Sequence, residues 1–189
     1  MIPLAFINYG GIQAIQTLWA GPWMLNISGY TPLQSATGLF WINITMLISY
    51  FIWGYILPKI SDYGINSIKL IKLGLPISYF SLSLIIYFGN NAGAFLFTIY
   101  IMTSIVISLT QPAIALNFSK NLAGKSLTSF NVFLFSGTFF VQWGIGLVID
   151  LCNNKGFDIL SSYRISFSLF LFLCVLSYTF FIYLNKNEN

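Results

Sequence analysis

Charged side chains are scarce in this sequence of 189 residues: only 6% are Asp, Glu, Lys or Arg, and histidine is absent. Soluble domains usually carry roughly 25% charged residues. Hydrophobic residues make up 57% of the chain, and the mean hydropathy is +0.82. This composition predicts an integral membrane protein that contacts the lipid bilayer. The net charge of +4 is spread over short connections, so we expect no nucleic-acid partner.

The groups that carry acid-base and metal chemistry are also missing from the long apolar stretches. No charged residue lies near the middle of a stretch; the nearest are Lys72 and Asp150, at stretch ends. The sequence contains no cluster of metal ligands, no nucleophile paired with a base and no phosphate-binding loop. We therefore expect neither an enzyme nor a cofactor. If the protein couples transport to a proton, the titrating residue lies elsewhere.

Six apolar stretches are long enough to cross a hydrocarbon core of roughly 30 Å, which takes about 20 helical residues. They predict an all-α integral membrane protein. Residues 1–184 should form one six-helix transmembrane domain, followed by a short cytoplasmic tail at 185–189. The spans are expected at 2–25, 33–57, 68–88, 92–116, 127–149 and 165–184.

The positive residues are distributed unequally between the two ends of these spans. Only Lys155 and Arg164 belong to one end, where Asp150 and Asp158 balance them. The opposite end has Lys59, Lys69, Lys72, Lys120, Lys125 and Lys186. Because cytoplasmic loops are enriched in Lys and Arg, the even-numbered connections and the C-terminus should be cytoplasmic.

Polar residues fall on one side of four of the six predicted helices. Residues three, four, seven or eleven apart share a helical face, because each residue advances by about 100°. The third and sixth stretches lack Asn and Gln, and we expect them to face lipid. Twice along the chain, two helices with a polar face are followed by one without such a face. This order predicts two three-helix repeats. The aligned residues are Tyr9, Gln13 and Gln16, then Gln34, Trp41 and Thr45, then Tyr100, Ser104 and Gln111, and finally Asn131, Thr138 and Gln142.

Two interpretations of these polar residues remain open. They could pair across helices, since interhelical hydrogen bonds are common and contribute about 0.6 kcal/mol on average. Alternatively, the amides could line a water-filled cavity, which satisfies their four hydrogen-bonding sites more easily than packed hydrocarbon does. Asn43 lies opposite the stripe of its helix and is expected to be a packing residue. The candidate substrate-pathway residues are Tyr9, Gln13, Gln16, Trp41, Tyr100, Gln111, Asn131, Thr138 and Gln142.

The tryptophans divide by their position along the helices. Trp23, Trp53 and Trp143 lie near helix ends and fit the aromatic belt at the membrane interface. Trp41 lies in the middle of its helix on the polar stripe. We therefore expect Trp41 to stack against a solute.

Short motifs near the start and in the second half of the chain resemble those of a known family. One is Leu18-Trp19-Ala20-Gly21-Pro22-Trp23; the others are Leu122–Lys125, Phe130-Asn131 and Val141–Gly146. The first looks like the seventh-helix ending of a group of bacterial transporters of the major facilitator superfamily, and the others look like that group's loop into the eleventh helix and the helix itself. The chain therefore resembles the C-terminal half of such a transporter. The similarity runs from about Ile12 to Asp150. It implies a half bundle of two three-helix repeats and transport of a small solute by alternating access.

The loop after the second stretch departs from the family's Gly-x-x-x-Asp-Arg signature. Gly54 fits the first position, but Pro58 stands in place of Asp and Lys59 in place of Arg. In the family these charged groups latch neighbouring helices in one conformational state. The resemblance therefore does not imply a normal latch in this half.

The family's transporters join two six-helix halves, whereas this chain supplies one. The resemblance therefore implies a second six-helix half or a homodimer, with the unidentified solute bound between halves. The start within an apolar run favours a piece of a longer protein. We expect a bacterial cytoplasmic (inner) membrane location. The alternative function is a non-catalytic six-helix membrane subunit that binds a partner or homodimerises through its striped face.

Overall fold

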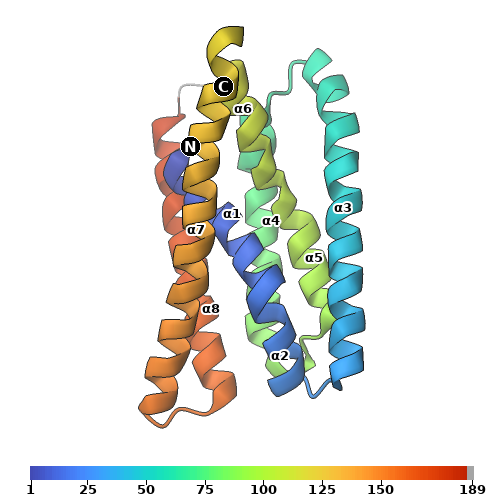
Figure 1. Ribbon diagram of the computed structural model, residues 1–189, viewed down its shortest axis with the longest axis vertical. Coiled ribbons are helices and arrows are strands. Elements are labelled where there is room, and N and C mark those ends of the chain that lie inside the picture. Colours follow the sequence, from blue (N-terminus) through green and yellow to red (C-terminus); the bar gives the residue numbers. More distant parts are fainter. Residues whose placement is uncertain (187–189) are drawn as a thin grey trace.

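A computed structural model describes residues 1–186, in which all regular structure is helical. Figure 1 shows the helices packed as one elongated bundle. Of the predicted tail, residues 187–189 lie outside the described part of the chain. The elements are α1 (Ile2–Ala14), η1 (Ile15–Trp19), α2 (Ala20–Asn26), α3 (Pro32–Asp62), α4 (Ser67–Phe88), η2 (Gly89–Asn91), α5 (Ala94–Ser104), η3 (Ile105–Leu109), α6 (Thr110–Leu116), α7 (Lys120–Asn154) and α8 (Ile159–Leu184).

The helices account for all six predicted apolar stretches. Five helical segments in the described residues are long and apolar enough to cross a membrane, which confirms a multi-pass membrane helical bundle. The remaining stretch is helical from Ile2 to Asn26, but a π-helical turn divides it into α1, η1 and α2. At about 1.5 Å per residue, its length is roughly 37 Å, enough to cross the hydrocarbon core.

Several helices extend beyond the predicted apolar limits because polar residues cap their ends. Thr31 and Gln34 form a reciprocal capping box at the start of α3, in which each side-chain oxygen accepts a hydrogen bond from the other residue's backbone N–H. Asn66 accepts from Lys69 N at the start of α4, and Asp158 from Ser161 N at the start of α8. Gln34, predicted on a polar stripe, thus also acts at a helix terminus.

Two spans lose regular α-helical geometry shortly before a proline. The π-helical turn η1 precedes Pro22, and the 3₁₀ turn η3 precedes Pro112. Proline lacks an N–H and its ring clashes with the carbonyl four residues earlier, so the preceding turn must widen or tighten. The first span nevertheless continues through Gly21 and Pro22 to Asn26, rather than ending at the Gly-Pro pair.

The helices alternate in direction, and the start of α1 and the end of α8 lie toward the same end of the bundle (Figure 1). α1 packs along α7, while α5 packs along α3. α4 packs against α5, and α8 packs against α1 and α7. α4 and α8 also contact each other, so the third and sixth spans are joined. The first span therefore crosses obliquely between α7 and α3 (Figure 1).

Two glycines allow α1 and α7 to approach closely. A Cβ atom on Gly137 would lie 2.2 Å from the carbonyl oxygen of Phe6, and one on Gly10 would lie 2.5 Å from the carbonyl carbon of Gly137. Both obstacles are backbone atoms, which cannot rotate aside. The contact between the first and fifth spans thus requires glycine at this crossing.

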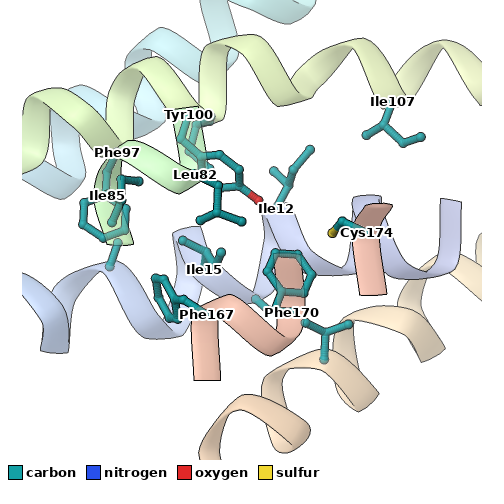
Figure 2. Close-up of a cluster of buried hydrophobic side chains, with 14 of the residues drawn as sticks. Ile12, Ile15, Leu82, Ile85, Phe97, Tyr100, Ile107, Phe167, Phe170 and Cys174 are labelled. Atoms are coloured by element: carbon teal, nitrogen blue, oxygen red, sulfur yellow. The ribbon is translucent and has the colours of Figure 1, made fainter. Parts of the chain in front are cut away.

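A buried aromatic cluster joins the first, fourth and sixth spans. Trp23 is fully buried and stacks on Phe167 with a ring-centroid distance of 4.9 Å. Phe97 and Tyr163 pack edge-on against the same indole. The assignment of Trp23 to the aromatic belt was wrong, because the ring lies in the core and away from the surface. Figure 2 shows Phe97 and Phe167 among the apolar side chains of this core.

The third and sixth spans each have an apolar outer face and serines on the inner face. Leu73, Ile77 and Phe80 are exposed on α4, as are Phe172, Leu176 and Phe180 on α8. Ser78, Ser81, Ser166 and Ser177 are buried. The exposed sides remain the expected lipid-facing surfaces.

Candidate functional site

A chain of hydrogen bonds connects polar side chains of the first and fifth spans. Gln142 Nε2 on α7 donates to Thr17 Oγ1 over 2.8 Å, and Thr17 Oγ1 donates to the main-chain carbonyl oxygen of Gln13 over 2.6 Å. Gln13 Nε2 in turn donates to the Tyr9 hydroxyl over 3.3 Å. Trp19 Nε1 also donates to the main-chain carbonyl oxygen of Gln142 over 3.3 Å. The π-helical turn therefore lies against α7 through both Thr17 and Trp19.

A second amide contact joins the first span to the second. Gln16 Nε2 donates to Asn43 Oδ1, and Asn43 Nδ2 donates to the Leu39 carbonyl over 2.7 Å. Gln16 Oε1 is buried and has no hydrogen-bond partner in the described part of the chain. This oxygen is an unused acceptor. We call Tyr9, Gln13, Gln16, Thr17, Asn43 and Gln142 the amide surface.

The amide surface lies at mid-depth in the bundle and is partly open. Gln13, Gln16 and Thr17 occupy the central third of the helical run from Ile2 to Asn26, and Asn43 and Gln142 the central thirds of α3 and α7. Thr17 and Asn43 are exposed, whereas Gln13 and Gln142 are half-buried. The bundle thus presents neutral hydrogen-bonding groups where a membrane would be most apolar.

Four of the predicted pathway residues belong to this surface: Tyr9, Gln13, Gln16 and Gln142. Thr138 lies beside it, because its backbone borders Gly10 of α1 while its hydroxyl donates to the Leu134 carbonyl over 3.2 Å. Gln111 and Asn131 are half-buried on α6 and α7. Within residues 1–186, no hydrogen bond joins either of them to the amide surface.

Trp41 is 57% exposed and does not point toward Gln16. Residues two apart on an α-helix point to nearly opposite sides, because each residue advances by about 100°. Asn43 is the residue of α3 that binds Gln16, so Trp41 lies on the other side of the helix. Trp41 therefore does not face Gln16 of the first span.

Tyr100 also lies apart from the amide surface. Its side chain is only 3% exposed and lies in the core. Figure 2 shows the Tyr100 hydroxyl directed from α5 toward Ile12 of α1, with Leu82 nearby. The fourth span thus contributes Tyr100 to the interior of the bundle.

The sequence reasoning missed Thr17 and Asn43. In a regular α-helix, Thr17 would lie outside the helical face that carries Tyr9. Thr17 belongs to the π-helical turn, which is wider than an α-helical turn and therefore shifts the residues on it around the helix axis. Asn43 was expected to pack, because it lies opposite the stripe of its own helix. Asn43 could have been found by also considering amides on the side of a helix opposite its polar stripe. Thr17 could have been found by considering polar residues that a proline follows closely.

The segment from Gly54 to Asp62, predicted as a loop, is the last part of helix α3 and makes a local contact. Lys59 Nζ lies 3.8 Å from the centre of the Tyr55 ring on the same helix. Gly54 has open space around its Cα, and Asp62 is exposed. Among the described residues, no group of three His, Cys, Asp or Glu side chains could hold a metal ion.

The chain was compared with family models, with curated proteins and with solved structures. None of the three comparisons found a match. The multi-pass helical architecture therefore rests on the structure itself. The resemblance to half a transporter rests on the sequence segments described above.

Proposed function

We propose that the chain is half of a solute transporter of the major facilitator type, which works by alternating access. The observation that carries this proposal is the amide surface, a partly open hydrogen-bonding surface at mid-depth in a largely apolar bundle. Polar groups facing hydrocarbon without partners cost several kcal/mol each, so water, a solute or another protein must cover them. A cavity between two halves supplies such a cover.

The packing of the spans supports two three-helix repeats. In two three-helix repeats, the first span corresponds to the fourth and the second span to the fifth. The contact between the first and fifth spans then corresponds to the contact between the fourth and second spans. Those are the pairs α1 with α7 and α5 with α3. The interruptions η1 and η3 fall in the first and fourth spans, which are corresponding positions. Broken helices at corresponding positions are typical of transporter binding sites.

The free groups of the amide surface indicate the chemistry of the solute. Gln13, Gln16 and Gln142 each donate to a protein oxygen, but within residues 1–186 no protein group donates to their side-chain oxygens. Each amide oxygen has two acceptor sites. Gln16 Oε1 is buried, whereas Gln13 and Gln142 are only half-buried. We propose a small neutral solute whose N–H or O–H groups bind the side-chain oxygens of Gln13 and Gln142.

The second half should be another six-helix chain or a second copy of this one. The lysine-rich end of the bundle, which includes the end of α8, should face the cytoplasm of a bacterial cell. The alternative function is a non-catalytic subunit that uses the amide surface only to bind a partner. Internal pairing of Gln16 with Asn43 and of Gln142 with Thr17 is the observation that favours this alternative.

Uptake into native membrane vesicles distinguishes the two functions. Vesicles are prepared from cells that carry either the wild-type chain or Gln142→Leu at its own locus, so that any natural partner is present. They are tested with a labelled hexose, polyol, neutral amino acid and nucleoside. We expect at least one compound to enter wild-type vesicles faster than gene-deleted vesicles, and Gln142→Leu to lose most of this difference at equal membrane abundance.

Thr179→Val is the matched control, because Thr179 is exposed on α8 and binds only its own helix. It should leave uptake unchanged. If no compound enters faster in the presence of the wild-type chain, transport of neutral polar solutes is rejected. If one does but Gln142→Leu transports it normally, the amide surface does not line its path.

A further inference from the structure

A small polar cavity lies between α1, α4, α5 and α8. Its volume, measured as the space open to the centre of a water molecule, is ≈ 10 Å³. The residues that line it include Asn8, Ser78, Tyr79, Tyr100, Ser104 and Cys174. A buried water needs roughly 10–15 Å³ by this measure and two to four polar partners. The cavity is therefore about the size of one water molecule.

Ser104 is the residue of the cavity lining whose buried hydroxyl lacks a geometrically suitable protein partner within residues 1–186. Its side chain is 3% exposed, and its Oγ has no hydrogen-bond partner among the described residues. Tyr100, one helical turn earlier, is equally buried, and its hydroxyl points into the core (Figure 2). A buried hydroxyl without a partner is unfavourable by about 1–3 kcal/mol, so an unpaired Ser104 needs an explanation.

The other polar groups around the cavity already have protein partners. The Tyr79 hydroxyl donates to Asn8 Oδ1 over 2.9 Å, and Asn8 Nδ2 donates to Ser177 Oγ over 3.1 Å. Ser78 Oγ donates to the Leu75 carbonyl over 2.8 Å. A hydroxyl that donates one hydrogen bond keeps acceptor sites, so the oxygens of Tyr79 and Ser78 can each accept from a water.

We infer that this cavity holds one structural water molecule. The water accepts hydrogen bonds from the hydroxyls of Ser104 and Tyr100 and donates to the oxygens of Ser78 or Tyr79. It thereby connects α5 to the network that already joins Asn8, Tyr79 and Ser177 on α1, α4 and α8. This inference does not depend on the proposed function, because the cavity and the amide surface have no residue in common.

The sign of a stability change tests the inference. If water is present, Ser104→Ala removes one of its partners, and the unfolding temperature of the purified protein should fall by about 2–4 °C. If the cavity is dry, the same change removes an unpaired hydroxyl and the unfolding temperature should rise. Tyr100→Phe removes the second hydroxyl while keeping the ring and should give the same sign.

Ser83→Ala measures the helix-propensity effect of the substitution itself, because Ser83 lies on α4 and binds only the Phe80 carbonyl of its own helix. A density map that shows other buried waters should show one peak within hydrogen-bonding distance of Ser104 Oγ. An empty cavity in such a map overturns the inference. A Ser104→Ala protein more stable than the Ser83→Ala protein also overturns it.

Discussion

Each glutamine of the amide surface binds a side chain that lies on a different turn or a different span. Gln16 reaches Asn43 on α3, and Gln142 reaches Thr17 on the π-helical turn. These bonds reduce the number of polar groups that lipid would otherwise contact. They leave the side-chain oxygens of the half-buried Gln13 and Gln142 free, so Gln142 can both hold the first and fifth spans together and bind a solute.

The contact between Gln16 and Asn43 should appear as an energetic coupling. Gln16→Leu and Asn43→Leu each remove one partner, and the double variant removes both. Each single variant already breaks the contact, so we expect the double variant to lose less free energy of unfolding than the sum of the two single losses. The difference should be about 0.6 kcal/mol, and at most about 1.7 kcal/mol. Unfolding in mixed micelles measures all four proteins. Strict additivity would show that the two amides do not interact.

At the level of the helices, the closest contact is the crossing of α1 and α7 at Gly10 and Gly137. Gly137→Ala would bring a Cβ atom to 2.2 Å from the Phe6 carbonyl oxygen, so the helices must separate. We expect a loss of roughly 1–3 kcal/mol in the free energy of unfolding. Reversible unfolding of the purified protein measures this loss.

Gly144→Ala is the matched control on the same helix, because a Cβ atom there meets nothing within 4 Å. It should not lower the stability, since alanine is the better helix former. Equal losses for both variants would mean that general helix effects, and not the crossing, explain the result.

The positions of the helices could be predicted because their apolar residues are continuous. Their detailed geometry could not, because Pro22 and Pro112 change the turns that precede them. The side of α3 that faces the first span was also unpredictable from polarity, since Asn43 and Trp41 are both mid-helix candidates. Tyr100 shows the same limit: the spacing of polar residues indicates which of them share a helical face, but not which helix packs against that face.

For the whole molecule, one end of the bundle carries most of the lysines and the middle carries the amide surface. Lys155 and Arg164 belong to the other end, where Arg164 Nε donates to the Ile86 carbonyl over 2.9 Å and its NH2 group to the Tyr87 carbonyl over 2.8 Å. Arg164 is therefore used to cap the end of α4. This asymmetry is the basis for the proposed orientation, with the lysine-rich end toward the cytoplasm.

The central claim is that the amide surface faces water and not lipid. It is tested most directly by the reaction of Thr17→Cys with a negatively charged methanethiosulfonate in native membranes, in a chain with Cys152→Ser. Cys174 is buried and can remain. Val175→Cys, on the exposed apolar side of α8, is the control. The account predicts that Cys at 17 reacts and Cys at 175 does not, because only a thiolate in contact with water reacts with this reagent. Equal protection of both positions would contradict the account.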